Sequence, residues 1–303
     1  MSLLVTGSIG IDTLKTPFGV RENCLGGSAV YFSMAASFLS PVRFVGVVGD
    51  DCPFDLRKFF AQRPVDLAGL EVRQGSKTFR WAGSYQGAMN EANTDAVALN
   101  VLAEAPPRLP EVFRDSQYVF LANTHPALQL ELLQQLQKPR LVVADTMNLW
   151  INNERTALVT LLGRIDGIVL NDGEARLFTG VSNLVAAGRE VLKLGPQFVV
   201  IKKGEHGAIL MTKKGDLFVL SAYLTEKVVD PTGAGDSFAG GLMGYLARRD
   251  NGRLDIADLR KALAYGTVIA SFVIEDFSLD RWQSVKSADI DARLEQLREM
   301  MNF

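Results

Sequence analysis

A glycine-rich turn that ends in an aspartate is the stretch of this chain best suited to chemistry. It reads Asp230-Pro-Thr-Gly-Ala-Gly-Asp236, and the pattern after it predicts a helix. The backbone N–H groups of Gly233, Ala234 and Gly235 would then form an anion site at the positive end of that helix. An aspartate placed there is suited to a general base that takes a proton from a hydroxyl group. The residues alone leave open a simpler interpretation, in which Asp236 only caps the helix.

Three more short motifs precede this turn. They read Leu25-Gly26-Gly27-Ser28, Asn171-Asp-Gly-Glu174 and Lys202-Lys-Gly-Glu-His-Gly207. Each also has an ordinary interpretation: tight helix packing, a helix N-cap with an acidic first turn, and a tight turn between strands. In this order, together with the aspartate turn, they resemble the ribokinase-like (PfkB) family of carbohydrate and nucleoside kinases. The resemblance covers essentially the whole chain.

The resemblance implies a ribokinase-like fold and a kinase that uses ATP and Mg²⁺ to phosphorylate a hydroxyl group of a small sugar or sugar-like substrate. Asp236 would be the general base, and the three amides before it would form the anion hole. The predicted nucleotide contacts are Asn171, Glu174, Lys202, Gly204, Gly207 and Ser271. The predicted acceptor contacts are Asp12, Gly26, Gly27, Tyr31 and Asn123.

The resemblance also implies metal sites. Glu174 would help to hold hydrated Mg²⁺ beside the phosphates, since carboxylate oxygens suit this ion. Asp230 and Thr232 match positions that bind a monovalent cation such as K⁺ in some members of the family.

Two departures from the family pattern bear on the acceptor. Tyr31 stands where many members have an asparagine that hydrogen-bonds the sugar, and an aromatic ring there would suit a nucleoside base. Only a short stretch separates Asp12 from Gly26, where many sugar kinases insert extra lid strands. The acceptor is therefore left open between a sugar and a nucleoside.

Short apolar runs alternate with helical patterns along most of the chain. This alternation predicts one α/β domain over residues 1–303 with a doubly wound, mainly parallel sheet, whose ligands bind beyond the carboxyl ends of the strands. Polar residues follow several predicted strands, at Asn123, Asp145, Asn171 and Lys202, and no role is assigned to Asp145 or Asn148. The predicted strands cover 3–6, 43–48, 118–121, 141–144, 167–170 and 198–201, and the helices 28–39, 54–62, 128–137, 154–162, 172–179, 184–194 and 237–247.

Residues 77–104 interrupt the alternation. Two strands are expected there, over 78–85 and 95–101, with a polar link between them and a short contribution from 13–24. One interpretation is an ordinary edge hairpin. The other is a small β lid that keeps water, which competes with the acceptor hydroxyl, away from the reacting phosphate.

Composition excludes several classes of function. A net charge of −2 without a basic run argues against nucleic acid and membrane surfaces as partners. Two cysteines suit a reducing cytosol, and two histidines argue against a histidine metal site. The start of the chain lacks a basic segment and is interpreted as a strand rather than a signal peptide, so a cytoplasmic protein is expected. The oligomeric state is left open between a monomer and a homodimer.

Alternatives to a sugar kinase remain at this point. A nucleoside kinase with an adenosine-like acceptor would use the same residues and mechanism. A non-catalytic nucleotide- or sugar-binding regulatory protein could keep the fold, although the intact Asp236 and the glycines before it argue for catalysis. No Gly-x-x-x-x-Gly-Lys-[Ser/Thr] loop is present and no Gly-x-Gly-x-x-Gly follows the first strand, which disfavours P-loop and dinucleotide enzymes.

Overall fold

A large sheet of nine strands carries the edge at which the sequence predicts a site. The computed structural model describes residues 2–249 and 254–302 of the chain. The strands are β1 (Leu3–Thr6), β4 (Val42–Gly49), β5 (Val65–Arg73), β8 (Tyr118–Leu121), β9 (Leu141–Asp145), β10 (Gly167–Asn171), β11 (Phe198–Lys202), β12 (Ala208–Thr212) and β13 (Leu217–Leu220). Their order is β13-β12-β11-β10-β9-β8-β1-β4-β5, and all pairs from β11 to β5 are parallel. The predicted doubly wound, mainly parallel fold is confirmed, and β12 and β13 add an antiparallel edge.

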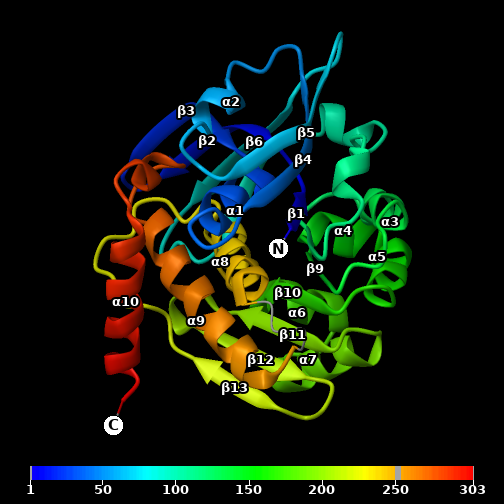
Figure 1. The fold of residues 1–303 in the computed structure, drawn as a ribbon. Coiled ribbons are helices and arrows are strands. Elements are labelled where there is room, and N and C mark those ends of the chain that lie inside the picture. Colours follow the sequence, from blue (N-terminus) through cyan, green and yellow to red (C-terminus); the bar gives the residue numbers. More distant parts are fainter. Residues whose placement is uncertain (1, 250–253, 303) are drawn as a thin grey trace.

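Helices cover both faces of this sheet (Figure 1). They are α1 (Ser28–Ala36), α2 (Leu56–Phe59), α3 (Pro126–Gln134), α4 (Asn148–Asn153), α5 (Arg155–Leu162), α6 (Asp172–Thr179), α7 (Leu184–Lys193), α8 (Ala234–Arg249), α9 (Ile256–Val273) and α10 (Ser287–Met300), with 3₁₀ turns η1 (Asn100–Ala103), η2 (Glu111–Phe113), η3 (Gly204–His206) and η4 (Asp280–Gln283). Alternate side chains of each buried strand enter different cores. Leu3 and Val5 of β1 pack with α1, α8 and α9, whereas Leu4 packs with α3, α5, α6 and α7.

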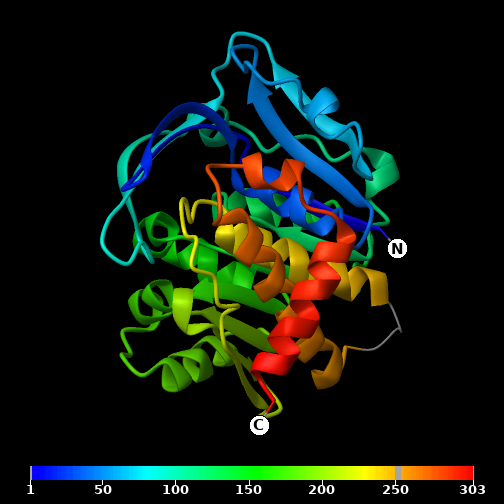
Figure 2. The same cartoon turned by 90° about the vertical axis from the view of Figure 1, so that its left-hand side faces the viewer.

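A second, small sheet stands beside the large one. It contains β2 (Gly10–Thr16), β3 (Gly19–Gly26), β6 (Phe79–Tyr85) and β7 (Ala92–Ala98), in the order β3-β2-β6-β7. Figure 2 shows it as curved blue and cyan ribbons that arch out from the rest of the molecule. Half of this sheet comes from 10–26, where the sequence suggested only a short contribution. Most of β3 is exposed, so it lacks the buried face that would have given a strand pattern.

Element boundaries differ from the predicted ones where loop geometry decides them. The helix expected over 237–247 begins earlier, at Ala234, because Gly233 turns the chain with φ 74°. The helix expected over 54–62 is reduced to the four residues of α2, and the strand expected over 95–101 is β7, which runs from Ala92 to Ala98. The Lys202–Gly207 motif forms the predicted tight turn, between antiparallel strands β11 and β12.

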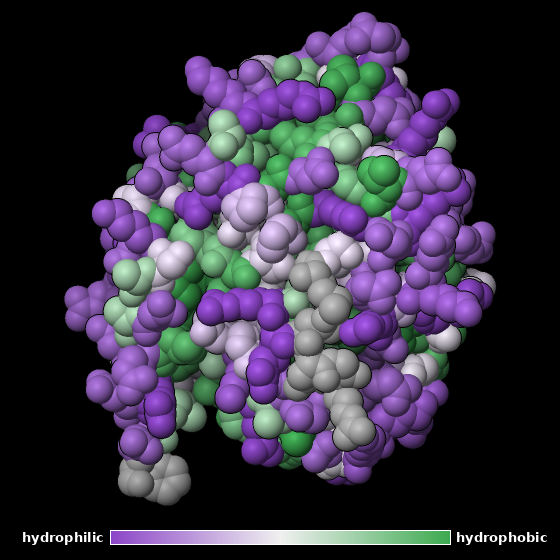
Figure 3. Space-filling model, in the orientation of Figure 1, coloured by the Kyte–Doolittle hydropathy of each residue, from purple (hydrophilic) through white to green (hydrophobic). Residues whose placement is uncertain are grey.

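The outer surface matches the composition. The face shown in Figure 3 is mainly hydrophilic, with separate hydrophobic areas between polar side chains. Across 2–249 and 254–302, every helix is too short or too polar to cross a membrane.

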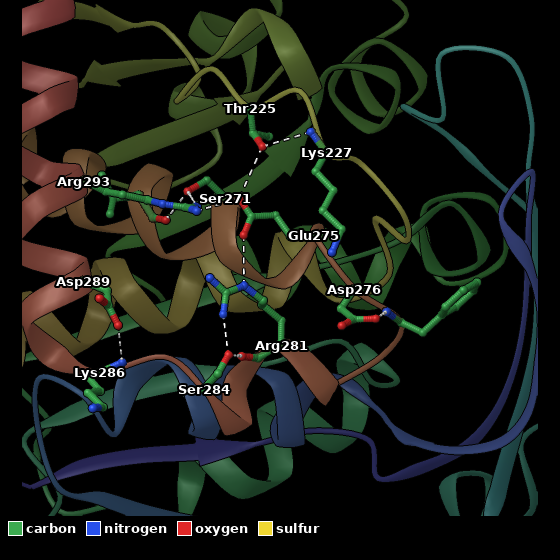
Figure 4. A network of polar contacts seen from close by, with 12 residues as sticks. Thr225, Lys227, Ser271, Glu275, Asp276, Arg281, Ser284, Lys286, Asp289 and Arg293 are labelled. Atoms are coloured by element: carbon green, nitrogen blue, oxygen red, sulfur yellow. Dashed lines mark hydrogen bonds and ion pairs between the residues drawn. The ribbon is translucent and has the colours of Figure 1, made fainter.

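A buried ionic network fastens the C-terminal helix (Figure 4). The Glu275 carboxylate accepts hydrogen bonds from Arg281 Nε (3.0 Å) and Arg293 Nη2 (2.6 Å). The Arg293 guanidinium also donates to Ser271 Oγ (2.9 Å) and lies 3.7 Å from the centre of the Phe272 ring. Because Arg293 belongs to α10 and Glu275 follows α9, the network fixes α10 against the loop that begins at the end of α9.

Replacing Glu275 tests the weight of this network. Glu275→Ala would leave two guanidinium groups facing each other without a carboxylate, and we expect the free energy of unfolding to fall by about 2 kcal/mol. Arg298→Ala on the same α10 is the control, since its partner Glu295 is 3.6 Å away and both side chains are exposed. The control should change stability by less than about 0.5 kcal/mol in urea unfolding. Equal effects of the two variants would show that the Glu275 network does not stabilise the protein more than an exposed ion pair does.

Candidate active site

The glycine turn before α8 adopts a shape that only glycine permits. Gly233 has φ 74°, and a Cβ placed on it would lie 2.2 Å from Cδ1 of Tyr31. The turn therefore rests directly on the Tyr31 ring. The Ala234 N–H donates to the Pro231 carbonyl (3.1 Å), so this amide is already engaged among the three predicted for the anion hole. Gly235 lies in the first turn of α8, whose N–H groups lack partners within the helix.

Asp236 and Lys202 meet at this helix end. Lys202 ends β11, and a Cβ on Gly235 would come within 2.6 Å of its Nζ, so the ammonium group lies against the first turn of α8. Asp236 is half-buried on the same turn. Burial raises the pKa of its carboxyl to about 6, and the Lys202 charge opposes the rise. At neutral pH such a carboxyl is ionised, yet it is a stronger base than a free aspartate.

Asn171 and Glu174 form a reciprocal cap at the start of α6. Asn171 Oδ1 accepts the Glu174 N–H and Glu174 Oε2 accepts the Asn171 N–H, both at 2.7 Å. The local interpretation of this motif is therefore correct, and a role toward phosphates or Mg²⁺ would use Asn171 Nδ2 and Glu174 Oε1. Burial raises the pKa of Glu174 to about 7, while Lys202 lowers it and Asp236 raises it.

Asp145 joins these groups from the end of β9. It is 6% exposed, and its Oδ1 has no hydrogen-bond partner among the residues that the structure describes. Burial, Asp236 and Glu174 raise its pKa well above the usual range, and Lys202 opposes this. The sequence analysis named Asp145 only as one of several polar residues at strand ends and gave it no role. Its position at the edge shared by these strand ends was the sequence signal for a place in the site.

The paired glycines admit a buried carboxyl group from β2. Asp12 is 4% exposed, and a Cβ on Gly26 would lie 1.8 Å from its Oδ2. Gly27 has φ 99°, and a Cβ there would come within 2.4 Å of the Ser8 carbonyl. Burial raises the pKa of Asp12 to about 8, with further contributions from Asp230 and Asp236, while the Gly27 N–H lowers it. Asp12 is thus the polar group held ready at the predicted acceptor side.

Two other predicted acceptor contacts, Tyr31 and Asn123, pack against or hydrogen-bond to neighbouring parts of the protein. Tyr31 is 1% exposed and lies beneath the Gly233 turn, so its ring presents no surface to a substrate. Asn123 accepts a hydrogen bond from Trp150 Nε1 (2.9 Å), and its Nδ2 lies 3.1 Å from Met147 Sδ. The side chain of Tyr31 thus supports the turn before α8, and that of Asn123 contacts Trp150 of α4.

The predicted nucleotide contacts are divided between two places. Gly204 (φ 55°) and Gly207 (φ 80°) form the turn after Lys202, whose ammonium group lies against the first turn of α8. Ser271 Oγ instead donates to the Val268 carbonyl (2.6 Å) and accepts from Arg293, within the network of Figure 4. The structure therefore brings together the glycine turn and Lys202, whereas Ser271 belongs to the packing of α9 against α10.

The Asp230 carboxylate holds the glycine turn through hydrogen bonds to two backbone N–H groups. It is fully buried, its Oδ1 accepts the Thr232 N–H (3.0 Å), and its Oδ2 accepts the Ser278 N–H (2.8 Å). The Thr232 hydroxyl donates to Tyr85 Oη (3.2 Å). The side chains of Asp230 and Thr232 thus have structural partners, and the monovalent-cation site expected there stays a prediction.

The donor set fits a hydrated Mg²⁺ beside phosphates better than a metal held by protein alone. In residues 2–249 and 254–302, no three His, Cys, Asp or Glu side chains converge to hold a metal ion. Mg²⁺ commonly keeps several waters and binds one or two carboxylates together with phosphate oxygens. The free Oδ1 of Asp145 and the buried Glu174 carboxyl supply oxygen ligands of that kind.

Comparison with known proteins points to kinases. The family described as "pfkB family carbohydrate kinase" matches residues 17–282. A cytidine kinase of Thermococcus kodakarensis is 28% identical over 249 residues, which cover 81% of this chain and 88% of that protein. The crystal structure of aminoimidazole riboside kinase from Salmonella enterica, complexed with aminoimidazole riboside and an ATP analog, superposes with a TM-score of 0.79 at 21% identity, covering 97% of this chain and 100% of the other. A putative ribokinase II from E. coli in complex with ATP and Mg²⁺ gives a TM-score of 0.75 at 17% identity, covering 97% and 99%.

The raised pKa of Asp12 predicts how stability changes with pH. Its carboxyl has a pKa of about 8 in the folded protein against an ordinary value of 3.8, so between these values the folded state holds a proton that the unfolded state has lost. Stability therefore falls as the pH rises through this window. Asp12→Asn removes that loss, so its Tm relative to wild type should be higher at pH 8.5 than at pH 5. The same Tm difference at both pH values would show that Asp12 ionises normally.

Proposed function

Because the chain belongs to the pfkB family of carbohydrate kinases, we propose that it transfers the γ-phosphoryl group of ATP to a sugar hydroxyl of a nucleoside, with Asp236 as general base. The kinase class follows from the family and its named relatives. The nucleoside acceptor is supported by the cytidine kinase, which matches along four-fifths of the chain.

One observation carries the catalytic assignment. Asp236 lies on the first turn of α8, beside the Lys202 ammonium group and next to the glycine turn. A base, a positive charge and a helix N-terminus thereby lie around the same small volume at the start of α8. Phosphoryl transfer depends mainly on positioning and on the stabilisation of charge, and this volume offers both.

The reaction follows from these positions. The acceptor hydroxyl oxygen attacks the γ-phosphorus while the bond from that phosphorus to the β–γ bridging oxygen breaks and ADP departs. The hydroxyl proton passes to the Asp236 carboxylate. Lys202 and the amides of Gly233 and Gly235 offset the negative charge on the transferring group. Asp12, buried against Gly26, binds acceptor hydroxyls and orients the attacking one.

Mg²⁺ belongs to the proposed site. Glu174 and Asp145 would hold it, directly or through water, and the bound ion neutralises part of the phosphate charge. Both carboxyls have pKa values raised by burial. A divalent cation beside them would favour their ionised forms, so metal binding and deprotonation are expected to occur together.

A free sugar is the second candidate acceptor. The family description names carbohydrate kinases, and the buried Asp12 would bind the hydroxyl pair of a free sugar as well as that of a ribosyl group. A regulatory protein without catalysis is disfavoured, because the first turn of α8 carries Asp236 and lies against the Lys202 ammonium group.

Asp236→Asn tests the base. The variant should bind ATP in calorimetry as the wild type does, whereas kcat should fall by about 10²- to 10⁴-fold, the usual worth of a positioned base. Wild-type kcat/KM should rise with pH through about 6, because only the ionised carboxyl accepts a proton, and the residual activity of the variant should lack this step. Asp216→Asn, in the turn between β12 and β13, is the control and should keep wild-type kcat. Near-full turnover of Asp236→Asn would refute the assignment.

A panel of acceptors tests the substrate class. Nucleosides, including cytidine and inosine, and free sugars, including ribose, are offered with ATP and Mg²⁺, and the products are identified by mass. We expect at least one nucleoside to exceed every free sugar by about tenfold or more in kcat/KM. A free sugar as the best acceptor would favour the second candidate, and ATP binding without any phosphorylated product would favour the regulatory protein.

A further inference from the structure

The end of β6 and the loop after it, residues 85–91, connect the small sheet to two turns of the proposed site. One is the turn before α8, and the other is the turn after Lys202. Tyr85 ends β6 and Ala92 begins β7, so the six residues 86–91 form the tip that connects these strands. The tip and the strand end make hydrogen bonds to two different turns outside the small sheet.

The first contact is made at the turn before α8. The Thr232 hydroxyl donates to Tyr85 Oη at 3.2 Å, and Tyr85 is only 8% exposed. Thr232 immediately precedes Gly233, and its N–H is fixed by Asp230 (3.0 Å). The side chain of Thr232 is therefore held by the small sheet while its backbone is held by the core. Loss of the Tyr85 hydroxyl would therefore loosen the backbone at Gly233.

The second contact is made at the turn after Lys202. Asn90 Nδ2 donates to Glu205 Oε1 (3.0 Å), and Asn90 Oδ1 accepts the Glu205 N–H (3.4 Å). A Cβ on Gly204 would lie 2.3 Å from Asn90 Oδ1, so the tip fills the open side of this glycine. The tip also reaches α6, where a Cβ on Gly173 would lie 3.7 Å from Glu91 Oε1.

We propose that residues 85–91 form a latch, in which Tyr85 is a positioning residue that holds the Gly233 turn against the small sheet. The proposal rests on the kinase function proposed above. A latched turn holds its amides on the γ-phosphoryl group while the small sheet excludes water. The acceptor hydroxyl, rather than water, then takes the phosphoryl group, and the wasteful reaction of ATP with water to ADP and phosphate is suppressed.

Tyr85→Phe removes the hydroxyl of the latch and keeps the ring. Its neighbour Ser84 is the matched control, because the Ser84 side chain lies on the opposite face of β6 and donates a hydrogen bond to Asp95 of the same small sheet (2.9 Å). With ATP, Mg²⁺ and the best acceptor of the panel, the ratio of ATP hydrolysed to acceptor phosphorylated should rise about 3- to 10-fold in Tyr85→Phe, the worth of one hydrogen bond. Ser84→Ala should keep the wild-type ratio. Equal ratios in the two variants would overturn the proposal.

The partner residue gives a second comparison. Thr232→Val removes the donor and should raise the same ratio, whereas Thr232→Ser keeps a hydroxyl and should restore it. The double variant Tyr85→Phe/Thr232→Val should be no worse than the more affected single variant, because both lose one shared contact. Additive effects would show that the two residues act separately, and would count against the latch.

Hydrogen exchange tests the latch without catalysis. In the protein without substrates, a peptide covering 230–241 should exchange faster in Tyr85→Phe than in wild type or Ser84→Ala. Unchanged exchange there would overturn the proposal. If the wild-type protein phosphorylates no acceptor, the proposed function fails, but this exchange difference still decides whether Tyr85 holds the turn.

Discussion

The buried Asp230 carboxylate is the contact on which the site depends. One oxygen accepts the Thr232 N–H at the start of the glycine turn, and the other accepts the Ser278 N–H in the loop after α9. The Ile274 carbonyl of that loop also accepts the Val229 N–H (2.7 Å). A fully buried charge is tolerated only when it is hydrogen-bonded, so these two chain segments must stay together. The position of Gly233, the start of α8 and the direction of Asp236 all follow from this clamp.

Several buried carboxyl groups lie near the turn that this clamp holds. Burial raises the pKa values of Asp12 and Glu174 to about 8 and about 7. Burial and the charges of Asp236 and Glu174 raise the pKa of Asp145 well above its usual range. Lys202 is the positive charge that opposes these shifts for Glu174, Asp145 and Asp236. Such crowding lowers stability at neutral pH, and proteins retain it mainly where function needs it. A divalent cation would relieve it, which explains why this arrangement suits a metal-dependent phosphoryl transfer.

The fold and the order of the motifs could be predicted from sequence because both rest on local patterns. Strands buried on both faces read as apolar runs, and the glycine turn needs its glycines for steric reasons that the sequence shows. Side-chain partners could not be predicted, because they depend on distant residues. Tyr31 lies beneath Gly233, Asn123 is bound by Trp150 and Ser271 by Arg293. The small sheet was underestimated for a similar reason, since β3 is mostly exposed and leaves no alternating pattern.

The most direct measurement is the pKa of the Asp236 carboxyl in the intact protein. Carbon-13 labelling of the aspartates, with Asp236→Asn to identify the signal, would give this value by NMR titration. Burial on the first turn of α8 predicts a pKa of about 6 for Asp236, and removal of the nearby charge in Lys202→Met should raise it further. A value near the ordinary 3.8, unchanged in Lys202→Met, would contradict the assignment of Asp236 as a base with a raised pKa beside Lys202.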